Sequence, residues 1–261
     1  MLDDLMTPFA PLVLASTRFA GLLMFTPVLS SAMMPRRAKV LMSVAFALAL
    51  LPWWWGSVPA GLELSALPAM IAGELLIGAT MGLVVNLPFV ACQLAGQIAG
   101  QQMGLGLAGV INPDADIAGD NLGQLLFLLS IVILIAIGGL DILFLTVASS
   151  FERMPMGAFA TSEAPLALVV AALASGFELA VRLSLPVLGI IFLETIAVGF
   201  IMKTVPTINI MSFGFPIRIL LGVMAFFFSL AYLHDALLVA IDGAVMSAVD
   251  WALSLGGSGG V

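Results

Sequence analysis

The side chains that could do chemistry in this chain are few, and their spacing does not form a catalytic site. The single histidine, His234, is followed directly by Asp235, and neighbouring residues on a helix point in different directions. A nucleophile, a histidine and an acid therefore cannot be grouped as in a hydrolase. There is no glycine loop with a phosphate-binding lysine, and Cys92 has no second cysteine to pair with. We expect no enzyme activity, no catalytic residue and no cofactor.

The acidic stretch from Asp114 to Asp120 is the segment whose spacing most resembles a metal site. Counted from Asp114 as the first position of a calcium loop, the fifth position is Ala118 and the twelfth is Leu125. A calcium loop requires an oxygen ligand at the fifth position and a glutamate at the twelfth. The sequence therefore predicts no metal site, and Asp120 is better interpreted as the N-cap of the next helix.

Ionisable side chains inside apolar runs are functional candidates, because burying charge in a membrane is costly. Glu178 and Arg182 are four residues apart with the acid first, which predicts a buried ion pair within one helix. Arg18 has no acid at helical spacing, so its partner must come from another helix or subunit. Glu74 and Glu194 are the carboxylates that could serve proton coupling, or they could instead bond to a neighbouring helix.

Two stripes of small or uncharged polar residues run along one predicted helix. They consist of Gln93, Gln97 and Gln101, and of Gly96, Gly100 and Gly104. The glycines allow another backbone to approach closely. The glutamines suit either hydrogen bonds between helices or the wall of a wet passage, and the stripes alone do not separate these two readings.

An apolar, glycine-rich segment follows the stripes. It consists of Met103, Gly104, Leu105, Gly106, Leu107, Ala108, Gly109, Val110, Ile111, Asn112 and Pro113. Its glycines disfavour a helix, and non-helical backbone at membrane depth persists only inside protein or against a cavity. A flexible apolar segment that fills a hole and withdraws from it meets that demand.

The composition of the chain is typical of an integral membrane protein. Of its 261 residues, 62% are apolar and 9% are charged, whereas soluble domains carry about 25% charged residues. Eight basic and fifteen acidic residues give a net charge of −7, so we expect no nucleic-acid partner. The acidic start, Met1-Leu2-Asp3-Asp4, and the length of the first apolar run indicate a retained helix rather than a signal peptide.

The apolar residues fall into six runs, which predict six long helices. The runs cover residues 8–30, 38–58, 67–103, 121–150, 166–202 and 216–251. Three of them would be roughly 55 Å long at 1.5 Å per residue, against a bilayer core of about 30 Å. Pro88 and Pro186 are expected to kink two of these helices. The last two runs read as a long hairpin, followed by a flexible glycine-rich tail at 252–261.

The basic residues indicate an orientation in the membrane. Arg36, Arg37 and Lys39 follow the first run, and Lys203 and Arg218 bracket the tip of the hairpin. Because loops rich in lysine and arginine face the cytoplasm, both of these loops are predicted to be cytoplasmic and both termini to lie outside.

Several segments, taken in order, resemble the FliR family of flagellar export-gate proteins and their relatives in type III secretion injectisomes. The matching segments are Arg18-Phe19-Ala20-Gly21, Phe25-Thr26-Pro27-Val28, Pro35 to Val40, Met103 to Pro113, Ser150-Phe151, and Met154-Pro155-Met156-Gly157. The most specific segments are 203–210, with Lys203, Pro206 and Asn209, and 214–217, with Gly214, Phe215 and Pro216. Together with Arg218 they form the predicted hairpin tip. The resemblance covers nearly the whole chain.

The resemblance implies an all-α membrane protein that forms a single subunit over residues 1–261. Residues 1–165 would resemble FliP and contain a plug loop at about 103–113, and residues 166–251 would form a FliQ-like helical hairpin. It further implies FliP and FliQ as partners in a hetero-oligomeric gate, with FlhB and FlhA nearby. That gate would lie in the inner membrane, in contact with lipid and at the flagellar basal body, and would pass unfolded export substrates.

Two alternatives are also compatible with the sequence. The chain could be the injectisome homologue of the same family, or, in a different functional class, a proton-coupled secondary transporter with six spans. A gate subunit is expected to purify in a large hetero-oligomer, whereas a transporter is expected to purify as a monomer or homodimer.

Overall fold

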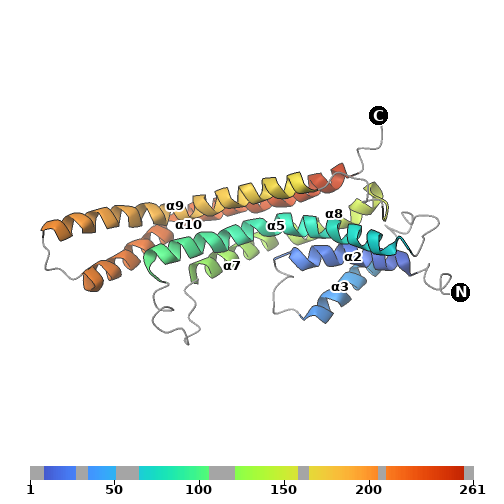
Figure 1. Ribbon diagram of the computed structural model, residues 1–261, viewed down its shortest axis with the longest axis horizontal. Helices are drawn as coiled ribbons and strands as arrows, with labels where there is room; N and C mark the ends of the chain where they lie inside the picture. The colour runs from blue at the N-terminus through green and yellow to red at the C-terminus, as the bar shows by residue number, and fades with distance from the viewer. Residues whose placement is uncertain are drawn as a thin grey trace. The chain divides into compact units, whose positions relative to one another are not determined.

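The computed structural model describes residues 9–27, 35–50, 65–105, 121–157, 165–204 and 210–255, and for 210–213 the backbone alone. Within these ranges the chain is entirely helical, without strands (Figure 1). The helices are α2 (Ala10–Phe25), α3 (Arg36–Ala49), α5 (Leu67–Met103), α7 (Asn121–Ala136), α8 (Gly139–Arg153), α9 (Leu166–Thr204) and α10 (Ile210–Ser254). The predicted all-α class is confirmed.

The predicted number of six long helices is not confirmed, because the described residues contain seven. The run at 121–150 was expected to be one helix, but it breaks at Gly138, which adopts a left-handed conformation with φ 68°. A right-handed helix cannot continue through that conformation, so α7 ends and α8 begins there. The helices α2 and α3 have 16 and 14 residues, fewer than the roughly 20 that a span requires.

In the described part of the chain, three helices are long and apolar enough to cross a membrane. They are α5, α9 and residues Gly214–Ser254 of α10, and the α7–α8 pair is a fourth candidate if its two helices form one span. The bounds of α5 coincide with the run predicted at 67–103. Pro88 and Pro186 lie inside α5 and α9, and α10 begins before Pro216 rather than at it. The glycine-rich end of the chain at 256–261 is outside the described residues.

The chain forms two compact units, and several helices contribute to both. Unit 1 comprises Met1–Leu87, Leu134–Leu173 and Ile241–Val261. In its core, Gly21 and Gly82 let α2 and α5 approach closely. A Cβ at Gly21 would lie 2.5 Å from the Leu75 carbonyl oxygen, and one at Gly82 would lie 2.8 Å from that of Leu22. The α2–α5 contact therefore rests on small residues in both helices.

Aromatic rings fill the other side of α2 in unit 1. The ring centroids of Phe19 and Phe46 are 6.0 Å apart, and those of Phe46 and Phe144 are 4.3 Å apart. Phe151 of α8 lies 6.2 Å from Phe19 and is fully buried. These contacts hold α2, α3 and α8 together in one core.

Unit 2 comprises Pro88–Ile133 and Ala174–Ala240. Its core joins the end of α5 to α9 and α10, and consists of Ala99, Met103, Val187, Ile191 and Ala225. The part of α7 in unit 2 packs on α5 as well, since the Ser130 hydroxyl donates to the Leu126 carbonyl at 2.7 Å and contacts the Cys92 sulfur of α5 at 3.0 Å.

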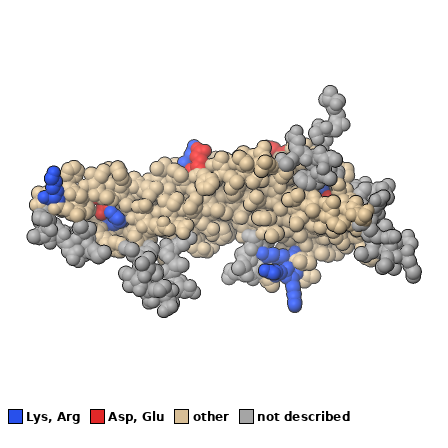
Figure 2. Space-filling view, in the orientation of Figure 1, with Lys and Arg blue, Asp and Glu red and all other residues tan. Residues whose placement is uncertain are grey.

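The two C-terminal helices expose most of their apolar surface in the isolated chain. Only 17% and 22% of the most apolar stretches of α9 and α10 are buried, against 67% for α5. Large apolar residues are exposed along both helices, including Phe192, Phe200, Phe227 and Phe228. Charged side chains occupy only a few patches of the face in Figure 2. Surfaces of this kind require lipid or other subunits to cover them.

Candidate functional site

The base of the predicted plug loop is a helix end with defined hydrogen bonds. The Leu105 amide donates to the Gly100 carbonyl, and the Gly104 amide donates to the Gln101 carbonyl, both at 3.0 Å. Gly104 has φ 84°. A left-handed glycine with these two bonds is a Schellman motif, which terminates a helix. The end of α5 at Met103 is thus encoded by Gly104, and the apolar contact typical of this motif is made by Leu105 against the unit 2 core.

Met103 anchors this base to α10. Its side chain is fully buried in the unit 2 core. A Cβ at Gly222 of α10 would lie 2.5 Å from Met103 Cγ, so the thioether chain occupies space that only a glycine leaves free. The rest of the predicted plug loop, Gly106–Pro113, lies outside the described residues, as does the acidic stretch to Asp120 that follows it.

The predicted hairpin tip also contacts the base of the loop. A Cβ at Gly104 would lie 2.5 Å from Cε2 of Phe215, in the second turn of α10. Gly104 is therefore required both by its backbone conformation and by the Phe215 ring. Of the other tip residues, Gly214 is half-buried and Lys203 and Pro216 are exposed, whereas Pro206 and Asn209 are outside the described residues.

An ion pair joins α9 to α10 one turn beyond Phe215. The Nε of Arg218 donates to Oε2 of Glu194 at 3.0 Å, and its NH2 group donates to the Thr195 hydroxyl at 2.9 Å. Glu194 is buried and Arg218 is one-third exposed. Glu194 was one of the two carboxylates considered for proton coupling, and it instead bonds to a neighbouring helix, which was the alternative.

The glycine and glutamine stripes of α5 face in different directions. Gly96 and Gly100 are buried, and a Cβ at Gly96 would lie 2.5 Å from the carbonyl carbon of Leu122 at the start of α7. The predicted close approach of another backbone is therefore found. Gln93 is half-buried, whereas Gln97 and Gln101 are exposed, so part of the polar stripe is available to whatever covers this face.

The predicted ion pair between Glu178 and Arg182 forms within α9, but not as a buried pair. Both side chains are 61% exposed, which corrects the expectation that this chain buries them. The reason is that the pair lines an open groove between α9 and α10, which the described part of unit 2 leaves uncovered.

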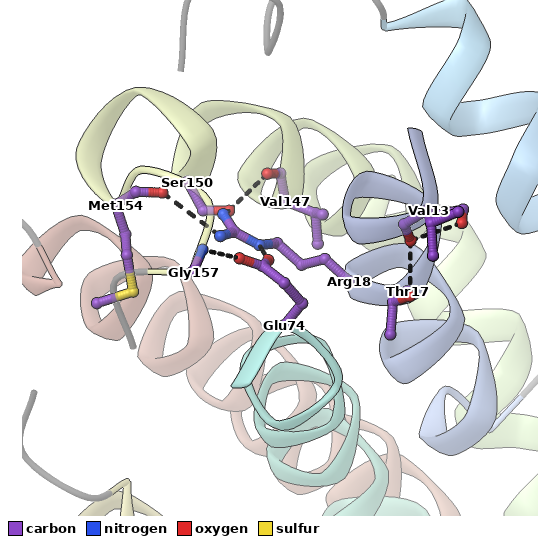
Figure 3. Close-up of polar contacts among 9 residues, drawn as sticks. Val13, Thr17, Arg18, Glu74, Val147, Ser150, Met154 and Gly157 are labelled. Carbon is purple, nitrogen blue, oxygen red and sulfur yellow. Dashed lines mark hydrogen bonds and ion pairs between the residues drawn. The ribbon is translucent and has the colours of Figure 1, made fainter. Parts of the chain in front are cut away.

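A buried polar network lies in unit 1 around Arg18 (Figure 3). Its Nε donates to Oε2 of Glu74 at 2.5 Å, and its NH1 group donates to the Ser150 hydroxyl at 2.8 Å. Its NH2 group lies 3.4 Å from the Met154 carbonyl oxygen. The other carboxylate oxygen of Glu74 accepts a bond from the Gly157 amide at 2.9 Å. The network thus links α2, α5, the end of α8 and the segment after it.

The network satisfies two charges that have no access to solvent. Arg18 and Glu74 are both fully buried, and the guanidinium carbon lies 4.1 Å from the centroid of the Phe151 ring. Buried charges are tolerated when they are paired and hydrogen-bonded. The sequence indicated that the partner of Arg18 lies on another helix, but it could not single out Glu74, because residue spacing contains no information on pairing between helices.

Comparison with known proteins decides the family of the chain. Residues 9–244 match the family described as "Bacterial export proteins, family 1". The chain belongs to this family. The match includes all of unit 2, most of unit 1, the Arg18 network and the base of the glycine-rich segment. Proteins of this family are components of the type III export apparatus, as the resemblance in the sequence implied.

This bacterial export protein is similar to named proteins of several bacteria. It is 26% identical to the flagellar biosynthetic protein FliR of Escherichia coli (strain K12), over 79% of this chain and 78% of that protein. It is 24% identical to FliR of Bacillus subtilis (strain 168), over 84% of this chain and 85% of that protein. It is also 24% identical to the secretion system apparatus protein SsaT of Salmonella typhimurium, over 70% and 71%.

Proposed function

We propose that this chain is the FliR-type subunit of a flagellar protein-export gate in the bacterial inner membrane, at the flagellar basal body. It would assemble with FliP and FliQ, near FlhB and FlhA, and help form the passage for unfolded flagellar subunits. The observation that carries the proposal is the family match over residues 9–244. The FliR relatives of E. coli and B. subtilis also align with more of the chain than SsaT does.

The test is deletion of the gene in its own organism, followed by measurement of secreted flagellar proteins in the culture medium. Loss of secreted filament and hook subunits, restored by the wild-type gene on a plasmid, is the expected result. If the deletion leaves flagellar secretion intact but stops secretion of other type III substrates, the injectisome assignment is correct instead.

The glycine-rich segment from Met103 to Pro113 is proposed as the resting closure of that passage. Support comes from its apolar composition and from its base, where the Schellman motif and the buried Met103 fix the start of the segment on α10. Removing residues 106–111 should leave the gate assembled but make the membrane permeable to small solutes. Unchanged permeability in an assembled gate would contradict the closure.

The described residues favour a gate subunit over a proton-coupled transporter. The two carboxylates that the sequence offered for proton coupling are both paired, Glu74 with Arg18 and Glu194 with Arg218. The exposed apolar surfaces of α9 and α10 also suit an assembly of several subunits. Purification in mild detergent separates the two, because a transporter would be recovered without other subunits.

A further inference from the structure

A groove of about 470 Å³ lies on unit 2 between α9 and α10. Glu178 and Arg182 line it from α9, and Tyr232, Asp235 and Val239 line it from α10. It brings two carboxylates and one guanidinium together on helices whose exposed residues are otherwise mostly apolar.

The charges of the groove do not cancel. Glu178 pairs with Arg182, which leaves one negative charge on Asp235. Among the described residues, no ion pair or hydrogen bond reaches the Asp235 carboxylate, and its side chain is exposed. The groove therefore presents an unsatisfied carboxylate beside a phenol hydroxyl and an apolar Val239.

The charges of the groove and its apolar surroundings favour another protein, rather than lipid, as its cover. Asp235 lies near the middle of α10 (Ile210–Ser254), and Glu178 and Arg182 lie in the central part of α9 (Leu166–Thr204). Phe177 and Phe228, close by in sequence, are 63% and 75% exposed. Acyl chains offer no hydrogen-bond donor to a carboxylate, so a protein surface covers a groove that is both charged and apolar better than lipid does.

We propose that the groove docks a helix of a neighbouring, different membrane subunit, which places a lysine or arginine side chain against Asp235. The net negative charge selects a cationic partner, and Val239 and the flanking phenylalanines supply the apolar contact for a helix. A second copy of this chain fits less well, because a symmetric contact would bring together two grooves that each carry a net negative charge. The inference rests on the proposed multi-subunit gate and specifies where one of its subunits binds.

Site-specific photo-crosslinking tests the docking site. A photoreactive amino acid replaces Val239 in the full chain, which is co-expressed with the FliP and FliQ of its own organism and purified in mild detergent. The expected result is an adduct with one of these subunits. Asp235→Asn should lower the yield of this adduct roughly tenfold or more, because a buried charge on the partner is left unpaired.

Asp250→Asn is the matched control, because Asp250 is exposed near the end of the same helix and outside the groove. It should leave the adduct unchanged. Asp235→Lys should abolish the adduct, and exchanging the facing basic residue of the partner for aspartate should restore it. That rescue distinguishes a charge contact from a folding defect.

Two results would overturn the inference while leaving the proposed function standing. One is an assembled gate in which position 239 crosslinks only to lipid, and the other is an equal adduct yield for Asp235→Asn and Asp250→Asn. If the wild-type chain purifies without FliP or FliQ, the gate proposal fails and the docking site fails with it.

Discussion

At the scale of single residues, paired charges and glycines determine which helices of this chain pack against one another. Arg18 and Glu74 are the clearest case, because each is fully buried and each would be left uncompensated without the other. Gly104 is a second case, because its backbone conformation and its contact with Phe215 both exclude a side chain. Arg18, Gly104 and Phe215 lie in segments by which the sequence resembles its family, so the family signature reflects packing as well as function.

Replacing Glu74 tests the buried pair. Glu74→Ala leaves the Arg18 guanidinium buried without its carboxylate, which should destabilise the chain by about 3–5 kcal/mol. The melting temperature of the purified chain in detergent measures this loss. Glu178→Ala is the control, since it removes a carboxylate from an exposed pair and should cost at most about 1 kcal/mol. Equal losses in the two variants would show that the Arg18 network is not a major source of stability.

Substitution of Gly104 separates backbone strain from crowding. Gly104→Ala should lose roughly 1–2 kcal/mol of stability because alanine is strained in the left-handed conformation. Its Cβ must also displace the Phe215 ring. Gly138→Ala should lose stability through backbone strain alone, because nothing lies within 4 Å of a Cβ there. We expect Gly104→Ala to be the more destabilising of the two. Adding Phe215→Leu should recover only the part of the loss that comes from crowding, and not the backbone strain. If the two glycine variants lose equal stability, the contact with Phe215 is unimportant.

At the scale of elements, the apolar pattern predicted helices well where a run was bounded by glycine or proline. The bounds of α5 follow from Pro68 at its start and from the Schellman glycine at its end. The break between α7 and α8 was missed because Gly138 and Gly139 are both compatible with a membrane helix, and only tertiary contacts decide whether such a glycine becomes left-handed. The exposure of the Glu178–Arg182 pair was missed for a related reason, because spacing predicts a pair but not which face of α9 is covered.

Glycine-to-alanine substitutions should lower the stability of the chain on the inner faces of these helices and raise it on their outer faces. Gly96→Ala brings a methyl group into the backbone of α7, so α5 and α7 must separate and stability falls. Gly189 and Gly199 of α9 have no atom within 4 Å of a built Cβ. Alanine at either position should stabilise the isolated chain by about 0.5–1 kcal/mol through helix propensity. Thermal denaturation of the three variants checks this, and a stabilising Gly96→Ala would contradict the α5–α7 contact.

At the scale of the whole molecule, the chain has many internal contacts around α5 and large uncovered surfaces on α9 and α10. The sequence anticipated this, since runs of roughly 55 Å do not fit a bilayer core of about 30 Å. It could not identify which helices pair inside the chain, because hydropathy is the same for a surface facing lipid, a partner or the core. Glu194 illustrates the limit, since its type marked it as a candidate and only the structure gives its partner, Arg218.

The Glu194–Arg218 pair connects the internal packing of the chain to its assembly. Arg218→Glu places two carboxylates together between α9 and α10, so we expect the two helices to separate near the tip and the yield of assembled gate to fall. The exchanged double variant, Arg218→Glu with Glu194→Arg, restores opposite charges and should recover most of the yield. Lys203→Glu is the control, because Lys203 is exposed and its reversal cannot be rescued by any change at Glu194. If the double variant assembles no better than Arg218→Glu alone, Arg218 acts on a partner subunit rather than through α9.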